Sequence, residues 1–173
     1  QAKTLFPYTT LFRSWRCDYI KGTVILTCDC RLEMAESLWL KGLSLRGFKS
    51  WSEATEVSFC QGFVSIIGSN GSGKSNLCDA ILFGLGISHH VLRVKRLSDL
   101  VSVGKPECAV QLTFSNGQMI ERRVSRVSNR DSWYVNGAAV GVRKAQEALK
   151  EFGFDVSFPE RYVSLQNSSS ALL

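Results

Sequence analysis

One eight-residue stretch, residues 68–75, constrains the fold of this chain more than any other. Its sequence is Gly-Ser-Asn-Gly-Ser-Gly-Lys-Ser, which fits the pattern G-x-x-x-x-G-K-S in full. A short apolar run with β-branched residues precedes it at residues 63–67, and apolar residues at helical spacing follow over residues 75–85. The sequence therefore predicts a strand buried on both faces, as in a parallel sheet, then a glycine-rich loop and a helix.

The residue types in this loop suit a nucleoside triphosphate with Mg²⁺. Glycines let successive backbone N–H groups point inward at phosphate oxygens, and the helix N-terminus adds partial positive charge. Lys74 would reach the β- and γ-phosphates, and the Ser75 hydroxyl would complete the coordination of Mg²⁺. A glycine-rich turn without a ligand is the alternative, and the separate prediction of a strand and a helix around the loop argues against it. The expected nucleotide contacts are Ser69, Asn70, Gly71, Ser72, Gly73, Lys74, Ser75 and Asn76.

Hydrophobic patterns place the other elements. Further strands are predicted at residues 43–46, 54–59, 108–114, 119–127 and 133–135. Asn116-Gly117 tolerates positive φ at both central positions of a type I′ turn, so the strands around it should form an antiparallel hairpin. Apolar residues at a spacing of 3.6 predict an amphipathic helix over residues 142–152. The predicted fold class is α/β, with a mixed β-sheet, the strand–loop–helix unit and a hairpin subdomain.

Two groups of side chains carry expectations about burial. Alternation along the hairpin sends neighbouring residues to opposite faces, and we expect the arginines there to be mostly exposed. These are Arg122, Arg123, Arg126 and Arg130. Three aromatic residues are expected in the core rather than in a base-stacking site, namely Trp51, Trp133 and Tyr134.

Composition limits the remaining possibilities. A chain of 173 residues with 45% hydrophobic residues is long and apolar enough for one globular domain with an appendage. The net charge of +6 favours anionic partners. Its 6 cysteines lack paired metal-ligand spacing and indicate reduced, intracellular thiols rather than zinc or disulfides. No apolar run approaches the roughly 20 residues that span a bilayer, so we expect no membrane partner.

The N-terminal segment is expected to lie outside the native fold. Residues 4–14 resemble the in-frame translation of a short-read sequencing adapter. We therefore predict that residues 1–33 are a non-native or disordered leader and that Met34 is the natural start. Residues 34–173 form the predicted domain, and a genuine basic extension is the alternative for the first segment.

Three strings of residues resemble one protein family. They are Leu-Arg-Gly-Phe-Lys-Ser-Trp at residues 45–51, Asn-Gly-Ser-Gly-Lys-Ser-Asn-Leu-Cys-Asp-Ala-Ile at 70–81, and Leu-Arg-Val-Lys-Arg-Leu-Ser-Asp-Leu at 92–100. Over residues 38–166 the chain resembles the N-terminal half-head of structural maintenance of chromosomes (SMC) proteins, in the ABC-type class with RecF, RecN and Rad-fifty. The third string looks most like the cohesin-type subunit. The departures from the family pattern are Ser69, Cys78 and the stretch Gln166-Asn167-Ser168.

The resemblance implies an ABC-type P-loop NTPase half-domain that binds ATP with Mg²⁺. Gln166 would be the glutamine that helps coordinate Mg²⁺ and place the attacking water, although a polar residue ending a strand at residues 161–166 is the alternative. Arg93 falls near the family's DNA-sensing arginine loop, and Lys95, Arg96 and Lys105 would enlarge the same basic patch. A solvated connector is the alternative for these four residues.

The family also needs a Mg²⁺-binding aspartate after an apolar strand, a neighbouring glutamate and a Leu-Ser-Gly-Gly-type signature, none of which occurs in this sequence. In SMC proteins they follow a long coiled coil and a hinge. We therefore expect a fragment, truncated before the coiled coil, that binds ATP and hydrolyses it only with the C-terminal half-head.

The resemblance also implies partners and a place in the cell. The implied partners are that C-terminal half-head, a second SMC head, a kleisin-type subunit and DNA. The implied location is the nucleus and chromosome of a eukaryote, or otherwise the cytoplasm or nucleoid. The alternatives are a fragment of a RecF- or RecN-type DNA-repair ATPase and a non-catalytic nucleotide-binding scaffold module.

Overall fold

Six strands form the main sheet of the protein. The computed structural model describes residues 15–20, 23–28, 38–62, 64–88 and 90–154. All neighbours in the main sheet are antiparallel, in the order β4-β3-β6-β7-β8-β9. The strands are β3 (Leu40–Arg46), β4 (Thr55–Ser58), β6 (Glu107–Phe114), β7 (Met119–Ser125), β8 (Asp131–Val135) and β9 (Ala138–Val140). The strands predicted from alternation are therefore confirmed.

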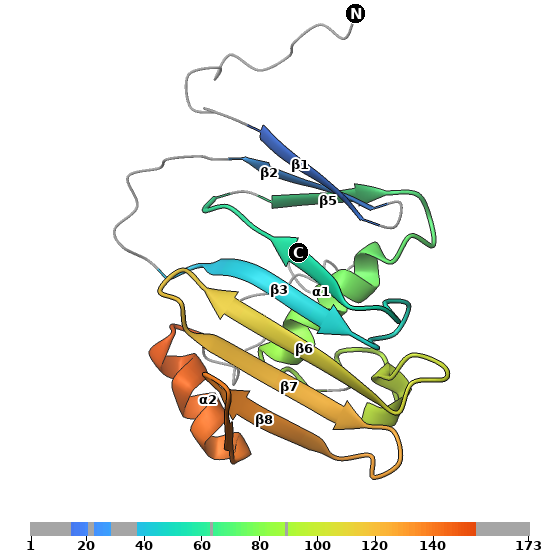
Figure 1. The fold of residues 1–173 in the computed structure, drawn as a ribbon, viewed down its shortest axis with the longest axis vertical. Coiled ribbons are helices and arrows are strands. Elements are labelled where there is room, and N and C mark those ends of the chain that lie inside the picture. Colours follow the sequence, from blue (N-terminus) through green and yellow to red (C-terminus); the bar gives the residue numbers. More distant parts are fainter. Residues whose placement is uncertain (1–14, 21–22, 29–37, 63, 89, 155–173) are drawn as a thin grey trace, which may run out of the picture.

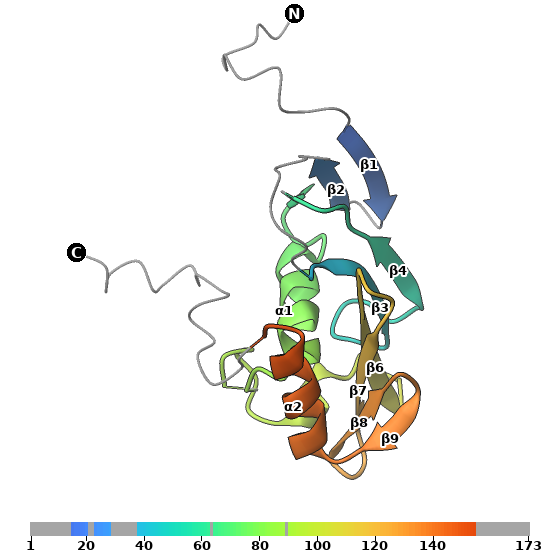
Figure 2. The same cartoon turned by 90° about the vertical axis from the view of Figure 1, so that its left-hand side faces the viewer.

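Two helices cover one face of this sheet. They are α1 (Lys74–Gly84) and α2 (Val142–Glu151), and both lie on the same side in the view of Figure 2. Apolar residues of α1, among them Leu77 and Phe83, join Leu112 and Phe114 of β6 in one buried core. The approach at the end of α1 is close, because a Cβ on Gly84 would lie 2.8 Å from the Leu112 Cγ. Both predicted helices are confirmed.

The two Asn-Gly pairs form different turns. Asn136 and Gly137 have φ of 50° and 81° and alone separate β8 from β9, as a type I′ turn requires. Between β6 and β7 only Gly117 of the Asn116-Gly117 pair has positive φ, at 83°. The predicted hairpin is present, but its type I′ turn is wrong. Four residues join these strands, and longer loops are usually built around a type I turn with one left-handed residue.

A second sheet precedes the glycine-rich loop. It has the order β1-β2-β5 and consists of β1 (Trp15–Ile20), β2 (Thr23–Cys28) and β5 (Val64–Gly68), all antiparallel. The predicted strand before the loop is confirmed as β5, but its burial on both faces in a parallel sheet is wrong. Among the described residues β5 has a strand on one edge only, and Ile67 is 48% exposed.

The hairpin β1–β2 falls within the segment predicted to be a leader. Its two strands pair with each other, and β2 pairs with β5. The assignment of residues 1–33 as a non-native leader stays a prediction. Among the described helices, none has both the length and the apolar character needed to cross a membrane.

Arg122 corrects the expectation for the hairpin arginines. It lies on the inner face of β7 and is 7% exposed, whereas Arg126 and Arg130 are exposed. Its guanidinium lies 4.3 Å from the ring centre of Phe83 and 4.6 Å from that of Trp133, and its Nη2 pairs with the Asp131 carboxylate at 2.7 Å. Alternation along β7 directs the Arg122 side chain to the inner face of the sheet. The paired Asp131 carboxylate compensates the cost of burying the guanidinium charge there.

The aromatic predictions hold in part. Trp51 and Trp133 are buried, which confirms their place in the core. Tyr134 is half-buried and lies under the Arg123 guanidinium, 4.4 Å from its ring centre. Tyr134 follows Trp133 on β8, so its side chain points to the other face of the sheet. The prediction that Tyr134 lies in the core is therefore wrong.

Candidate nucleotide-binding site

The glycine-rich loop connects the end of β5 to the start of α1, as Figure 1 shows. Gly71 and Gly73 have φ of 82° and 98°, in the left-handed region where glycine has no steric cost. Gly73 is the N-cap of α1, and no side chain caps that end by a hydrogen bond. The backbone N–H groups of the first turn are therefore available to an anion.

Lys74 arches back over this loop. Its Nζ donates hydrogen bonds to the Gly68 carbonyl oxygen at 2.6 Å and to the Ser69 carbonyl oxygen at 2.7 Å. The ammonium is thus held at the concave side of the loop by two carbonyl groups. A phosphate bound there would meet a positive charge that the loop has already positioned.

The structure brings all eight predicted contact residues together in this loop and the first turn of α1. Ser69, Asn70, Gly71 and Ser75 are exposed, and the other four are half-buried. Ser75 occupies the second position of α1 with its hydroxyl accessible, which fits a ligand to Mg²⁺ that retains several waters. The donor set therefore suits a triphosphate with Mg²⁺. Gln166, the predicted second Mg²⁺ ligand, lies outside the described residues.

Thr23 is a residue near the loop that sequence reasoning missed. It is buried at the start of β2, and its hydroxyl donates to the Ser72 carbonyl oxygen at 3.2 Å and lies 3.1 Å from the Ser72 Oγ. No signal in the sequence could have found it, because it belongs to the segment predicted to be a leader. It supports the loop from the side of the second sheet.

The predicted basic patch is partly neutralised. An Nη of Arg93 lies 3.7 Å from the Asp79 Oδ2, although the Arg93 side chain is 66% exposed. Lys105 pairs with Glu53 at 3.2 Å. Lys95 and Arg96, which lie between Arg93 and Lys105 in the sequence, are exposed. The structure therefore leaves cations accessible in this connector and gives two of them acidic neighbours.

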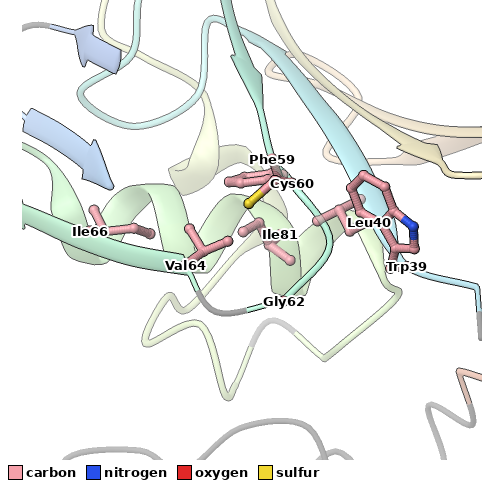
Figure 3. Close-up of a pocket in the computed structure, with 8 residues that line it drawn as sticks. All are labelled: Trp39, Leu40, Phe59, Cys60, Gly62, Val64, Ile66 and Ile81. Atoms are coloured by element: carbon pink, nitrogen blue, oxygen red, sulfur yellow. The ribbon is translucent and has the colours of Figure 1, made fainter. Parts of the chain in front are cut away.

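An apolar pocket lies beside β5, apart from the residues predicted to bind nucleotide. It has a volume of about 300 Å³ and is bounded by β5, α1 and the start of β3. Figure 3 shows its lining, which consists of Trp39, Leu40, Phe59, Cys60, Gly62, Val64, Ile66 and Ile81. Such a lining offers few donors to a phosphate group, so this pocket does not suit a triphosphate. Within the described residues, no group of three His, Cys, Asp or Glu side chains could hold a metal.

Comparison with known families agrees with this geometry. Residues 39–158 match the family described as the RecF/RecN/SMC N terminal domain. The chain belongs to this family. Its relatives include the chromosome partition protein Smc of Thermoplasma acidophilum, which is 38% identical over 69% of this chain and 11% of that protein. Structural maintenance of chromosomes protein 2 of Gallus gallus is 33% identical over 70% of this chain and 12% of that protein.

Solved structures of SMC-type proteins have the same fold. One, from work on ATP-driven dimerization and DNA-stimulated activation of SMC ATPases, has a TM-score of 0.63 and 29% identity over 78% of this chain and 96% of the solved chain. The recombination mediator RecF, with a TM-score of 0.52 and 24% identity, shares the fold. The SMC family and the ABC-type fold class predicted from the sequence are therefore confirmed, while the cohesin-type subfamily stays a prediction.

Proposed function

We propose that this chain is the ATP-binding N-terminal half of a chromosome-organising SMC-type ATPase. The observation that carries the proposal is the loop itself, which combines a Lys74 ammonium held by two loop carbonyl groups with a helix N-terminus that no side chain caps. ATP would bind there with Mg²⁺, and Ser75 would be a ligand of the metal. The SMC family membership of residues 39–158 supports this assignment.

Hydrolysis belongs to the complete head in this proposal. The chain spans 11% to 12% of the length of the two relatives named above, so the activity of a whole SMC protein is inferred rather than carried by these residues alone. We propose that the C-terminal half-head supplies the remaining catalytic groups, with Gln166 as a ligand of Mg²⁺. The reaction is phosphoryl transfer to water, promoted by positioning and by stabilisation of charge on the γ-phosphate.

Partners and location complete the proposal. A second SMC head would close over the bound nucleotide, a kleisin-type subunit would join the heads, and DNA would meet the connector that carries Arg93, Lys95, Arg96 and Lys105. Dimerization and DNA stimulation are described for the SMC ATPases of the solved structure, which supports these two partners. The site of action would be the chromosome, in the nucleus or in a nucleoid.

Titration of the chain with a fluorescent ATP analogue in the presence of Mg²⁺ tests the proposal. Wild type should bind, and Lys74→Ala should lose at least about tenfold in affinity, because a charge-assisted contact to phosphate is removed. Lys144→Ala, an exposed lysine of α2, is the matched control and should bind as wild type. Equal affinity of Lys74→Ala and wild type would refute nucleotide binding at the loop.

The hydrolytic part of the proposal needs a second measurement. Phosphate release should appear only when the chain is mixed with a C-terminal SMC half-head, and it should require Lys74. If the mixed sample binds ATP but releases no phosphate, with or without DNA, the non-catalytic scaffold becomes the better interpretation.

A further inference from the structure

The turn at residues 48–51 lies directly against the glycine-rich loop. It is closed by two backbone hydrogen bonds, from the Phe48 N–H to the Trp51 carbonyl oxygen at 2.9 Å and from the Trp51 N–H to the Phe48 carbonyl oxygen at 2.7 Å. Lys49 adopts a left-handed backbone with φ of 46°, which is unusual for a residue other than glycine. The chain therefore reverses tightly here and presents consecutive side chains at a fixed spacing.

Three consecutive side chains of this turn contact the loop and α1. The Lys49 Nζ donates to the Asp79 Oδ2 at 2.6 Å, and the Trp51 indole N–H donates to the Gly73 carbonyl oxygen at 3.4 Å. Between them the Ser50 Oγ accepts a hydrogen bond from the Asn76 side-chain amide at 2.8 Å. The contacted residues of the helix recur every three positions, at 73, 76 and 79, so they lie along one side of its first two turns.

The turn is itself anchored on the side away from the helix. The Lys49 N–H donates to the Leu100 carbonyl oxygen at 2.7 Å, and the Ser102 hydroxyl donates to the Lys49 carbonyl oxygen at 2.7 Å. The Lys49 Nζ also donates to the Leu92 carbonyl oxygen at 3.2 Å. Because Lys49 is held by Leu92 and, further along the chain, by Leu100 and Ser102, the turn is a fixed support rather than a free loop.

The turn and the loop approach each other closely at Gly73, where the backbone conformation also favours glycine. A Cβ on Gly73 would lie 3.0 Å from the Ser50 Oγ and 3.1 Å from the Trp51 Nε1, and the φ of 98° at this position already favours glycine. Gly73 therefore allows the turn to pack against the loop, in addition to allowing the left-handed backbone conformation of the loop. The position of the turn and the position of the loop are fixed together.

From these contacts we propose that the turn at residues 48–51 positions the phosphate loop and that Lys49 is its main positioning residue. The inference rests on the proposed binding of ATP at the loop. Lys49 acts on the site in two ways. It tethers α1 one turn after Ser75, and it neutralises the Asp79 carboxylate, whose side chain is only 6% exposed. Without Lys49, Asp79 would keep the more distant and 66% exposed Arg93 guanidinium at 3.7 Å, and its carboxylate would be less fully neutralised one turn after Ser75.

Nucleotide titration of Lys49 variants in the 173-residue chain tests the proposal. Lys49→Met should weaken binding of the fluorescent ATP analogue by about tenfold, because the loop would then have to be ordered at the expense of binding free energy. Lys49→Arg keeps the charge and should recover most of the affinity. The double variant Lys49→Met with Asp79→Asn leaves no unpaired buried charge, so it should remain folded and should still bind weakly because the tether is absent. Lys144→Met is the matched lysine control.

Amide hydrogen exchange without nucleotide separates this proposal from the assignment of ATP to the loop. In the double variant, exchange at the Leu77 amide, which is bonded to the Gly73 carbonyl oxygen at 2.9 Å, should be faster than in wild type, while exchange in α2 should not change. The core variant Ile120→Val removes one methyl group from a fully buried side chain of β7 and lowers stability without touching the turn. It should change neither exchange at Leu77 nor nucleotide affinity.

Each outcome bears on one of the two proposals. If the double variant matches wild type in exchange at Leu77 and in affinity, the positioning role is overturned. If Ile120→Val weakens nucleotide binding as much as Lys49→Met does, the effect is one of general stability and the role is overturned as well. If wild type does not bind the analogue but exchange at Leu77 responds as expected, the positioning of the loop stands and the assignment of ATP fails.

Discussion

Replacing Arg122 with methionine should destabilise the protein more than any other single arginine replacement on β7. The guanidinium is enclosed by the rings of Phe83 and Trp133, and its Nε donates to the Asp131 Oδ2 at 2.9 Å. Its Nη1 donates to the Phe83 carbonyl oxygen at 3.1 Å, at the C-terminal end of α1. That end has no basic residue of its own in its last turn, so Arg122 supplies the cation that a helix C-terminus favours.

The size of the effect follows from burial. Removing one partner of a buried ion pair costs about 3–5 kcal/mol, because the other charge stays behind unpaired. The Asp131 side chain is 27% exposed and partly solvated, so we expect the lower end, about 3 kcal/mol. Arg123→Met is the matched control on the same strand. Its pair with Glu121 is on the outer face, where such pairs contribute about 0–1 kcal/mol.

Urea unfolding followed by circular dichroism measures both variants. The midpoint should fall for Arg122→Met with an unchanged slope, and it should barely move for Arg123→Met. Arg122→Lys keeps a cation but loses the fork geometry and should fall between them. A loss below about 1 kcal/mol for Arg122→Met, or equal losses in the two methionine variants, would show that the buried guanidinium does not stabilise the fold in this way.

Two further predictions concern a thiol and the basic connector. Burial raises the pKa of the Cys108 thiol to about 11 in the folded protein, against 9.0 for an ordinary thiol, so stability should decline as pH rises from 9 to 11. Between pH 9 and 11 the thiol ionises only in the unfolded chain, so the urea midpoint should fall less with rising pH in Cys108→Ala than in wild type. Identical pH profiles of the two proteins would contradict a raised pKa for Cys108. Neutralising Arg93, Lys95 and Arg96 to glutamine should lower the slope of log affinity for DNA against log salt by up to about 3, and a slope equal to that of a Lys144→Gln control would exclude them as phosphate contacts.

Local features of the sequence predicted most of the fold. The phosphate loop was predictable because its glycines, its lysine and the flanking strand and helix all lie within about twenty consecutive residues. The pairing of β6 with β7 was predictable because a turn joins them directly. The turn type was not, because it depends on how many residues separate the two strands, and only the second Asn-Gly pair is alone between its strands.

Other features depend on contacts between distant residues. The burial of Arg122 requires Asp131 and Trp133 on the next strand. The residue type alone, a charged arginine, favoured an exposed position. The support of the loop by Lys49 joins residues 30 positions apart, and nothing in the short string around Lys49 indicates Asp79 as its partner. The neighbours of β5 are likewise set by strands that are remote in the sequence.

The open edge of β5 has a consequence for association of the protein in solution. Among the described residues its main-chain N–H and C=O groups find a strand on one side only, and Ile67 is 48% exposed beside the loop. An uncovered edge of this kind is a template on which a further strand can add, whether from a cognate domain or from another copy in a concentrated solution. Association of copies in a concentrated solution and addition of a strand from another domain would therefore compete for the same row of backbone groups.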